Sequence, residues 1–250
     1  MAACGYGAGS EPYALPALSQ GVADGNILYA RLCAWCHGSQ GEGTSRGPNL
    51  DGDLDGGAYT HFMLSSGRMP LSSPTERSGR GPTALNVSQI DTLVAHVENL
   101  GGSGPSVPDP QPETGNVSSG AELYLTNCAP CHSSTGVGGA LTSGNAAPAL
   151  TNPDITPTQV AEAMLVGPGC ENTDRECGPG SGAMPRFGFD SGEVDDIVAY
   201  VIQLQTGGNR GGWSIGRIGP VSEGAIGWIL GLGLMLAVIR WIGTRVGEKK

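Results

Sequence analysis

Three observations predict a mainly α-helical chain with two tandem domains and one C-terminal transmembrane helix. Residues 25–33 match residues 120–128, with Gly, Leu, Tyr and Cys at corresponding positions. Each half closes with apolar residues at helical spacing, and neither contains a convincing alternating strand pattern. An uncharged apolar run extends from Gly224 to Ile239. The pattern therefore predicts an internal duplication followed by a membrane anchor.

Changes in composition mark the boundaries of the duplicated domains. The first domain is predicted at 18–100 and the second at 117–206, with a Pro-, Gly- and Ser-rich linker between them. The other predicted segments are an N-terminal segment at 1–17, the linker at 101–116, a tether at 207–223, the transmembrane helix at 224–242 and a basic tail at 243–250.

The repeat extends through each domain. A Cys-x-x-Cys-His motif is followed by a Gly-rich loop, a Pro-x-Leu sequence, a short helical stretch and a Gly-x-Met-Pro sequence. Corresponding residues are Pro48 and Pro148, Met63 and Met164, and Met69 and Met184. The closing amphipathic helices present the apolar stripes Ile90, Leu93, Val94, Val97 and Leu100 in the first domain, and Val194, Ile197, Val198, Val201 and Leu204 in the second.

Composition and charge exclude some classes of protein. The net charge is −10, which argues against nucleic-acid binding and against a lysine-ringed mobile carrier. Glycine (43) and proline (18) are so abundant among the 250 residues that the apolar core is expected to be modest. A covalent cofactor is one way to stabilise such domains.

The C-terminal apolar run is long enough to cross a bilayer. It resumes at Trp241 and Ile242 after Arg240, whose long side chain can reach the interface. Basic residues follow the run, whereas Glu223 precedes it. The positive-inside rule then places the C-terminus in the cytoplasm and the two domains on the outer face of the plasma membrane. A buried core helix is the competing interpretation.

Two motifs have the attachment pattern of c-type haem. They are Cys33-Ala-Trp-Cys36-His37 and Cys128-Ala-Pro-Cys131-His132. Two thiols attach one haem, and the histidine that follows becomes the proximal iron ligand. Zinc binding and dithiol redox chemistry are the alternatives. The sequence therefore predicts two haem c groups and an exported location.

The second axial ligands are predicted to be Met69 and Met184, because each lies in the corresponding Gly-x-Met-Pro sequence. Core packing is the alternative for both. Met63 and Met164 are interpreted as core residues, and His96 as a packing or surface residue. His61 has no histidine counterpart in the second domain, so we expect it at the surface or against the haem edge, with distal ligation as the alternative.

Three further residues and one pair complete the predicted sites. The Pro48 and Pro148 carbonyls either accept the Nδ1 proton of the proximal histidines or belong to plain turns. Cys170 and Cys177 enclose a short insertion and are expected to form a disulfide. Cys4 follows two alanines as a lipidated cysteine would, but no complete signal peptide precedes it, so we expect a truncated start or a longer precursor.

The chain resembles the dihaem cytochrome cc subunit of the actinobacterial-type cytochrome bc (menaquinol–cytochrome c reductase) complex, from about Gly25 to Ile242. The resemblance is strongest in Asn127–His132, Gly138–Gly144, Ala163–Leu165, Met184-Pro185, Asp196–Val201 and Gly219–Gly224. It implies two class I-type cytochrome c domains, association with a cytochrome b subunit, electron acceptance from a Rieske iron-sulfur protein and delivery to a terminal cytochrome oxidase. The start of the chain and the Cys170–Cys177 insertion depart from the family pattern.

The preferred hypothesis is an electron-transfer subunit of a quinol-oxidising complex, with no bond chemistry of its own. An anchored dihaem carrier serving another oxidase or a dehydrogenase is the alternative. A catalytic haem protein such as a peroxidase needs an open iron position, which the paired methionines argue against. The short tether at 207–223 predicts that the haem at His132 accepts electrons and the haem at His37 delivers them onward.

Overall fold

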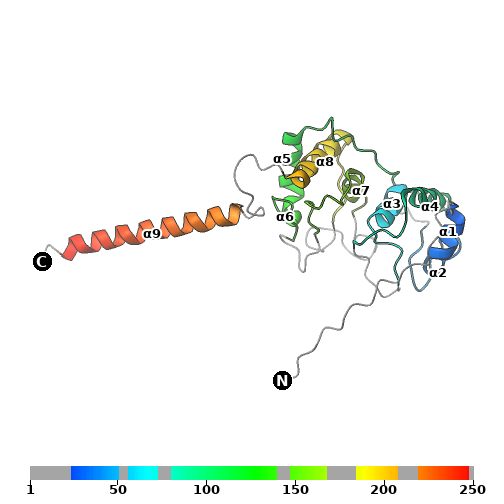
Figure 1. The fold of residues 1–250 in the computed structure, drawn as a ribbon, viewed down its shortest axis with the longest axis horizontal. Helices are drawn as coiled ribbons and strands as arrows, with labels where there is room; N and C mark the ends of the chain where they lie inside the picture. Colours follow the sequence, from blue (N-terminus) through cyan, green and yellow to red (C-terminus); the bar gives the residue numbers. More distant parts are fainter. Residues whose placement is uncertain are drawn as a thin grey trace, which may run out of the picture. The chain divides into compact units, whose positions relative to one another are not determined.

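The computed structural model describes residues 24–50, 56–72, 80–139, 147–167, 184–207 and 219–247. The chain divides into two compact units, Met1–Thr206 and Gly207–Lys250. The described part is helical without named strands, apart from an isolated bridge between Thr44 and Gly47, which confirms the predicted fold class. The final helix is α9 (Gly219–Gly247), drawn in orange and red in Figure 1.

The other helices belong to the two halves of the duplication. The first domain contains α1 (Gly25–Leu32), α2 (Ala34–His37), α3 (Gly57–Ser65) and α4 (Val87–Asn99). The second domain contains α5 (Val117–Asn127), α6 (Ala129–His132), α7 (Pro157–Val166) and α8 (Ser191–Thr206). Figure 1 shows the same order in each half: a first helix, a very short helix at the motif, a middle helix and a closing helix.

The helix starts have sequence-encoded caps. Asp24 and Asn116 cap α1 and α5, because each side-chain oxygen accepts a backbone N–H from the first turn. Both α4 and α7 begin with a capping box, formed by Asn86 and Gln89 in α4 and by Thr156 and Gln159 in α7. These reciprocal bonds fix where each helix begins.

A glycine permits close helix crossing in each domain. Gly25 of α1 lies against the Thr92 carbonyl of α4, and Gly120 of α5 lies against the Asp196 carbonyl of α8. A Cβ atom at either glycine would overlap this backbone. The glycine shared by residues 25–33 and 120–128 is therefore explained by packing, because the first and last helices of each domain cross there.

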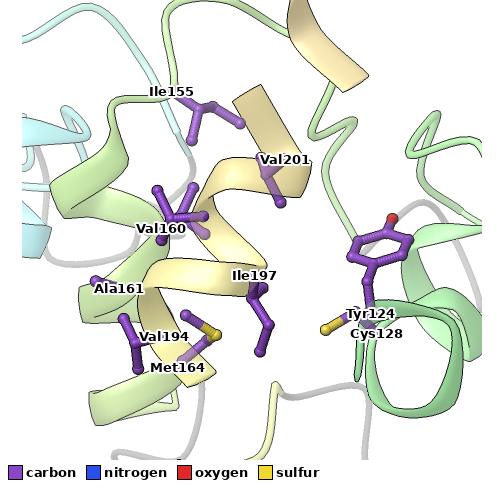
Figure 2. Packing of buried hydrophobic residues seen from close by; sticks show 10 residues of the cluster. Tyr124, Cys128, Ile155, Val160, Ala161, Met164, Val194, Ile197 and Val201 are labelled. Carbon is purple, nitrogen blue, oxygen red and sulfur yellow. The ribbon is translucent and has the colours of Figure 1, made fainter. Parts of the chain in front are cut away.

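Each domain has its own apolar core. The first includes Leu28, Tyr29, Ile90, Leu93 and Val97 among its buried residues. The second is built mainly from α5, α7 and α8, and Figure 2 shows Ile197 and Val201 of α8 beside Val160 of α7. The predicted stripes are buried except at their ends, because Leu100 and Leu204 are only partly buried. Burying each large side chain contributes about 1.5–3 kcal/mol.

The linker between the domains is fixed at several backbone positions. The Ala58 amide of α3 donates to the Pro105 carbonyl over 2.9 Å. Farther along, the Gln111 amide donates to Asp195 over 2.7 Å, and the Asn116 amide donates to Asp196 over 2.6 Å. Two adjacent aspartates of α8 therefore hold the end of the linker against the second domain.

The final helix has the length and composition of a membrane span. Its apolar stretch Gly224–Thr244 contains 21 residues, and none of its most apolar window is buried against the rest of the described chain. At a rise of about 1.5 Å per residue, this stretch extends for about 30 Å, the thickness of a bilayer's hydrocarbon core. A core helix would bury one face, so the exposure of this stretch favours the predicted membrane anchor over the core-helix interpretation.

Candidate haem sites

The first Cys-x-x-Cys-His motif occupies a single helical turn. Cys33 follows α1 and caps α2, which contains Cys36 and His37. The amides of Cys36 and His37 donate to the Cys33 carbonyl over 3.0 and 2.9 Å. Both thiols and the imidazole therefore come from one turn, as the motif spacing predicts.

The second motif repeats this construction. Cys128 joins α5 to α6, and the amides of Cys131 and His132 donate to its carbonyl over 3.1 and 2.8 Å. Cys128 is itself part of the buried cluster, and Figure 2 shows its sulfur directed towards Ile197 of α8. One cysteine of the motif therefore faces the apolar interior of the domain.

A proline carbonyl orients each motif histidine. His37 Nδ1 lies 2.8 Å from the Pro48 oxygen, and His132 Nδ1 lies 3.0 Å from the Pro148 oxygen. A carbonyl can only accept, so Nδ1 carries the proton and the lone pair is on Nε2. The structure confirms the histidine–carbonyl interpretation over the plain turn.

Burial keeps the second histidine in the form that binds metals. His132 is 6% exposed. Loss of solvent lowers the pKa of its imidazole, against the opposing effect of the Pro148 hydrogen bond. The neutral ring with a free Nε2 lone pair is therefore favoured at neutral pH.

One buried tyrosine in each domain fixes the end of the haem motif. Tyr29 donates to the Gly38 carbonyl over 2.8 Å, and Tyr124 donates to the Ser133 carbonyl over 2.9 Å. Gly38 and Ser133 both have positive φ, which turns the chain back after the histidine. The alignment of the two halves of the repeat matched these tyrosines, but no role was predicted for them. Their recurrence at corresponding positions was the only sign in the sequence that they serve the motif.

The thiols suit covalent attachment better than the competing chemistries. Burial, with a smaller contribution from the neighbouring cysteine, raises the pKa of both Cys33 and Cys128 to about 12. A dithiol redox pair needs a stabilised thiolate, which this environment disfavours. Among the described residues, no three His, Cys, Asp or Glu side chains gather as a zinc site requires.

The candidate methionine ligands lie at the edges of the two cores. Met69 packs against the first cluster together with Cys33, and Met184 packs against the second, which contains Cys128. The structure thus brings each methionine to the core that also holds a motif cysteine. Met63 and Met164 are buried, as predicted for core residues.

The other two histidines contact residues outside the motifs. His96 packs on the Tyr29 ring with 4.9 Å between ring centroids, as the packing interpretation predicts. His61 pairs with Glu162 of the second domain at 2.6 Å, a contact that sequence reasoning missed. Cys4 and the predicted Cys170–Cys177 disulfide lie outside the described residues.

These features fit covalently attached haem. Each motif offers two thiols without a disulfide on one turn, an imidazole with Nε2 left for a ligand, and a methionine at the edge of the adjoining core. The class that this fold and site define is a tandem c-type cytochrome, with two cytochrome c domains and one candidate transmembrane helix.

Comparison with known proteins supports this class and identifies the family. The cytochrome c family model matches residues 22–101, and the model for subunit III of cbb3-type cytochrome c oxidase matches residues 115–201. The cytochrome bc1 complex cytochrome c subunit of Corynebacterium diphtheriae is 33% identical over 90% of this chain and 81% of the relative. The corresponding Mycobacterium tuberculosis subunit is 35% identical over 88% and 77%.

The chain belongs to the family of cytochrome c subunits of the cytochrome bc1 complex. It is therefore an electron-transfer protein that binds haem c. A weaker similarity, 31% identity over 48% of this chain and 41% of the relative, connects it with the cbb3-type cytochrome c oxidase subunit FixP of Azorhizobium caulinodans. The predicted family is confirmed.

Proposed function

We propose that this chain binds two haem c groups and transfers electrons from the Rieske protein of a quinol-oxidising cytochrome bc complex to a terminal cytochrome oxidase. The observation that supports this most strongly is the duplicated motif turn, with a proline carbonyl on each histidine. When bound, haem iron supplies a one-electron couple. The polypeptide attaches the group and orients the axial imidazole, and in the second domain it also buries that imidazole, His132.

The proposed attachment residues are Cys33 and Cys36 for the first haem, and Cys128 and Cys131 for the second. His37 and Met69 are the proposed axial ligands of the first iron, and His132 and Met184 those of the second. Support comes from the Nδ1 hydrogen bonds and from the position of each methionine at the core of its own domain.

The proposed partners follow from membership of a bc1-complex family. They are a cytochrome b subunit, the Rieske iron-sulfur protein and a terminal cytochrome oxidase, with membrane lipid around 224–242. The domain boundaries proposed from the sequence, 18–100 and 117–206, are supported by the extents of the two family matches. An anchored dihaem carrier for another oxidase or dehydrogenase is the second candidate, favoured by the similarity to a cbb3-type oxidase subunit.

The proposed location is the plasma membrane, with both haem domains on its outer face. The support is the charge distribution around the anchor, where Arg240, Arg245 and the two terminal lysines lie on the C-terminal side. Under this orientation residues 243–250 are cytoplasmic.

Haem content and partners test the proposal together. Chain purified from its native membranes, then denatured and acid-extracted, should keep two haems per chain, because thioether bonds survive unfolding. A gently solubilised sample should contain a cytochrome b and a Rieske subunit. Haem that extracts freely would refute covalent attachment, whereas an oxidase or dehydrogenase without cytochrome b would favour the second candidate.

A further inference from the structure

The two domains contact each other through α3 and α7, which are corresponding helices of the duplication. His61 of α3 and Glu162 of α7 meet there, with 2.6 Å between Nδ1 and Oε1. The match of Met63 with Met164 makes His61 and Glu162 equivalent positions, 101 residues apart. The contact therefore joins one position of the repeat to its own counterpart.

Contact between equivalent positions indicates a local two-fold relation. In a two-fold contact the same surface of both copies meets, whereas a head-to-tail contact joins different surfaces. A second hydrogen bond joins Gln159 to Ser65 over 3.1 Å. The counterparts of these residues are Ala58 and Val166, and both are buried, at 0% and 2% exposure, which agrees with a two-fold relation.

The paired residues differ in chemistry, and this difference makes the contact possible. Glu162 is fully buried, and its Oε2 has no hydrogen-bond partner in the described part of the chain. A buried carboxylate is costly unless it is paired, and His61 is the partner in the structure. Two glutamates here would repel one another, and two histidines would lack the carboxylate. The unlike pair therefore favours contact of α3 with α7 over contact of either helix with a second copy of itself.

Arg80 forms further hydrogen bonds between the two domains. Arg80 of the first domain donates to Gln159 over 3.2 Å and to the Asp154 carbonyl over 2.7 Å. Among the described residues, each apolar cluster contains residues of a single domain. Among the hydrogen bonds between the domains in the described part of the chain, the His61–Glu162 pair contains the most deeply buried carboxyl group.

We infer that His61 and Glu162 are a positioning pair that holds the two cytochrome domains in one two-fold-related arrangement and so fixes the separation across which electrons pass between the haems. The part that concerns electron passage rests on the proposed function. The structural part does not, because it follows from the contact between α3 and α7.

Exchanging the two residues tests the pair. In the full-length chain within its solubilised complex, hydrogen–deuterium exchange is measured by mass spectrometry for peptides covering α3 and α7. His61→Glu places two carboxylates together and Glu162→His places two imidazoles together, so each should raise exchange there by about tenfold or more. The double variant restores an unlike pair at equivalent positions and should return exchange to within about threefold of the native chain.

Controls separate this inference from the proposed function. Glu122→Gln changes an exposed glutamate of α5 and should leave exchange in α3 and α7 unchanged. Haem content of each variant reports folding. Single variants that do not alter exchange, or a double variant that does not restore it, would overturn the inference. Normal electron transfer from the second haem to the first in a variant with an opened contact would overturn its functional part, whereas a native chain without two haems would refute the proposed function alone.

Discussion

At the scale of single residues, each proposed haem site combines residues close to the motif in sequence with residues from later in the domain. The motif turn and the tyrosine hydrogen bond arise within a few residues, whereas the proline carbonyl and the methionine come from later in each domain. The carbonyl fixes the tautomer of His132 and strengthens it as a ligand. Of these features, the proposed methionine ligand is the one that a single substitution tests most clearly.

Replacing Met184 by alanine should remove one of two sulfur ligands. The oxidised protein is expected to show a weak sulfur-to-iron charge-transfer band at the red end of the visible spectrum. Met184→Ala should lose about half of this band, and its iron should bind carbon monoxide because the distal position opens. The matched control is Met164→Leu, which retains core volume and should leave the band unchanged. An intact band in Met184→Ala, or its loss in Met164→Leu, would assign the ligand to a different residue.

At the scale of elements, crossing of the first and last helices determines the shape of each domain. Gly120 is in the middle of α5, where alanine would normally improve helix propensity by about 1 kcal/mol. Its Cβ would instead meet the backbone of Asp196, which cannot rotate away as a side chain can. The packing cost should therefore exceed the gain in propensity.

Gly120→Ala should destabilise the second domain by about 1–3 kcal/mol. Denaturant unfolding of the haem-loaded chain, followed through the absorbance of the haem bound to this domain, measures the change. The control is Gly188→Ala, because nothing lies within 4 Å of a Cβ there, and its effect should stay within about 0.5 kcal/mol. Equal stability of the two variants would contradict the close-crossing account.

The sequence predicted the helices and motif turns better than it predicted the hydrogen bonds that hold these elements together. The repeat, the motif turns and the apolar stripes are encoded at short spacing, so they could be located in advance. The histidine–carbonyl bond was only one of two interpretations, because a proline after a loop is equally compatible with a turn. The fixed linker was missed because Asp195 and Asp196 accept backbone amides, which leave no residue signature.

The contact between domains was the least predictable feature. His61 was noted only for lacking a histidine counterpart, and its expected place was the surface or the haem edge. The structure instead pairs it with Glu162, which lies in the other domain. The available signal was a histidine and a glutamate at equivalent positions of two corresponding helices.

At the scale of the whole molecule, the contact between the domains should weaken as pH rises. The hydrogen bond to Glu162 raises the pKa of His61, and burial raises the pKa of Glu162. Closed domains therefore bind protons more tightly than separated ones, so the stabilisation is complete at low pH and is lost as pH rises through the raised pKa values. Asp91 of α4 also favours protonated His61. The cations nearby are Arg80, bonded to the Asp154 carbonyl before α7, and Arg68, which lies over the Phe62 ring of α3.

Hydrogen exchange of α3 and α7, corrected for intrinsic exchange, should increase as pH rises above the ordinary pKa values of the pair, about 4.3 for a glutamate and about 6.5 for a histidine. Exchange in α5 should not follow this trend. Glu162→Gln can still hydrogen-bond to His61 but cannot titrate, so its profile should be flatter. A native profile that opens towards acid would contradict the sign of the linkage.

The proposed path of electrons is the central claim at this scale. The segment 207–223 that connects the second domain to the anchor is short, and a Rieske protein works near its membrane-embedded quinol site. The haem at His132 is therefore proposed to accept electrons first, and the haem at His37 to pass them to the oxidase.

Removing the first haem alone tests this path most directly. The double variant Cys33→Ala and Cys36→Ala is placed in the complete complex, quinol is supplied, and reduction of the remaining haem and oxygen consumption are recorded together. The account predicts that the haem at His132 is reduced at the native rate while oxygen consumption stops. Loss of its reduction would reverse the proposed order, and continued oxygen consumption would show that electrons reach the oxidase without the first haem.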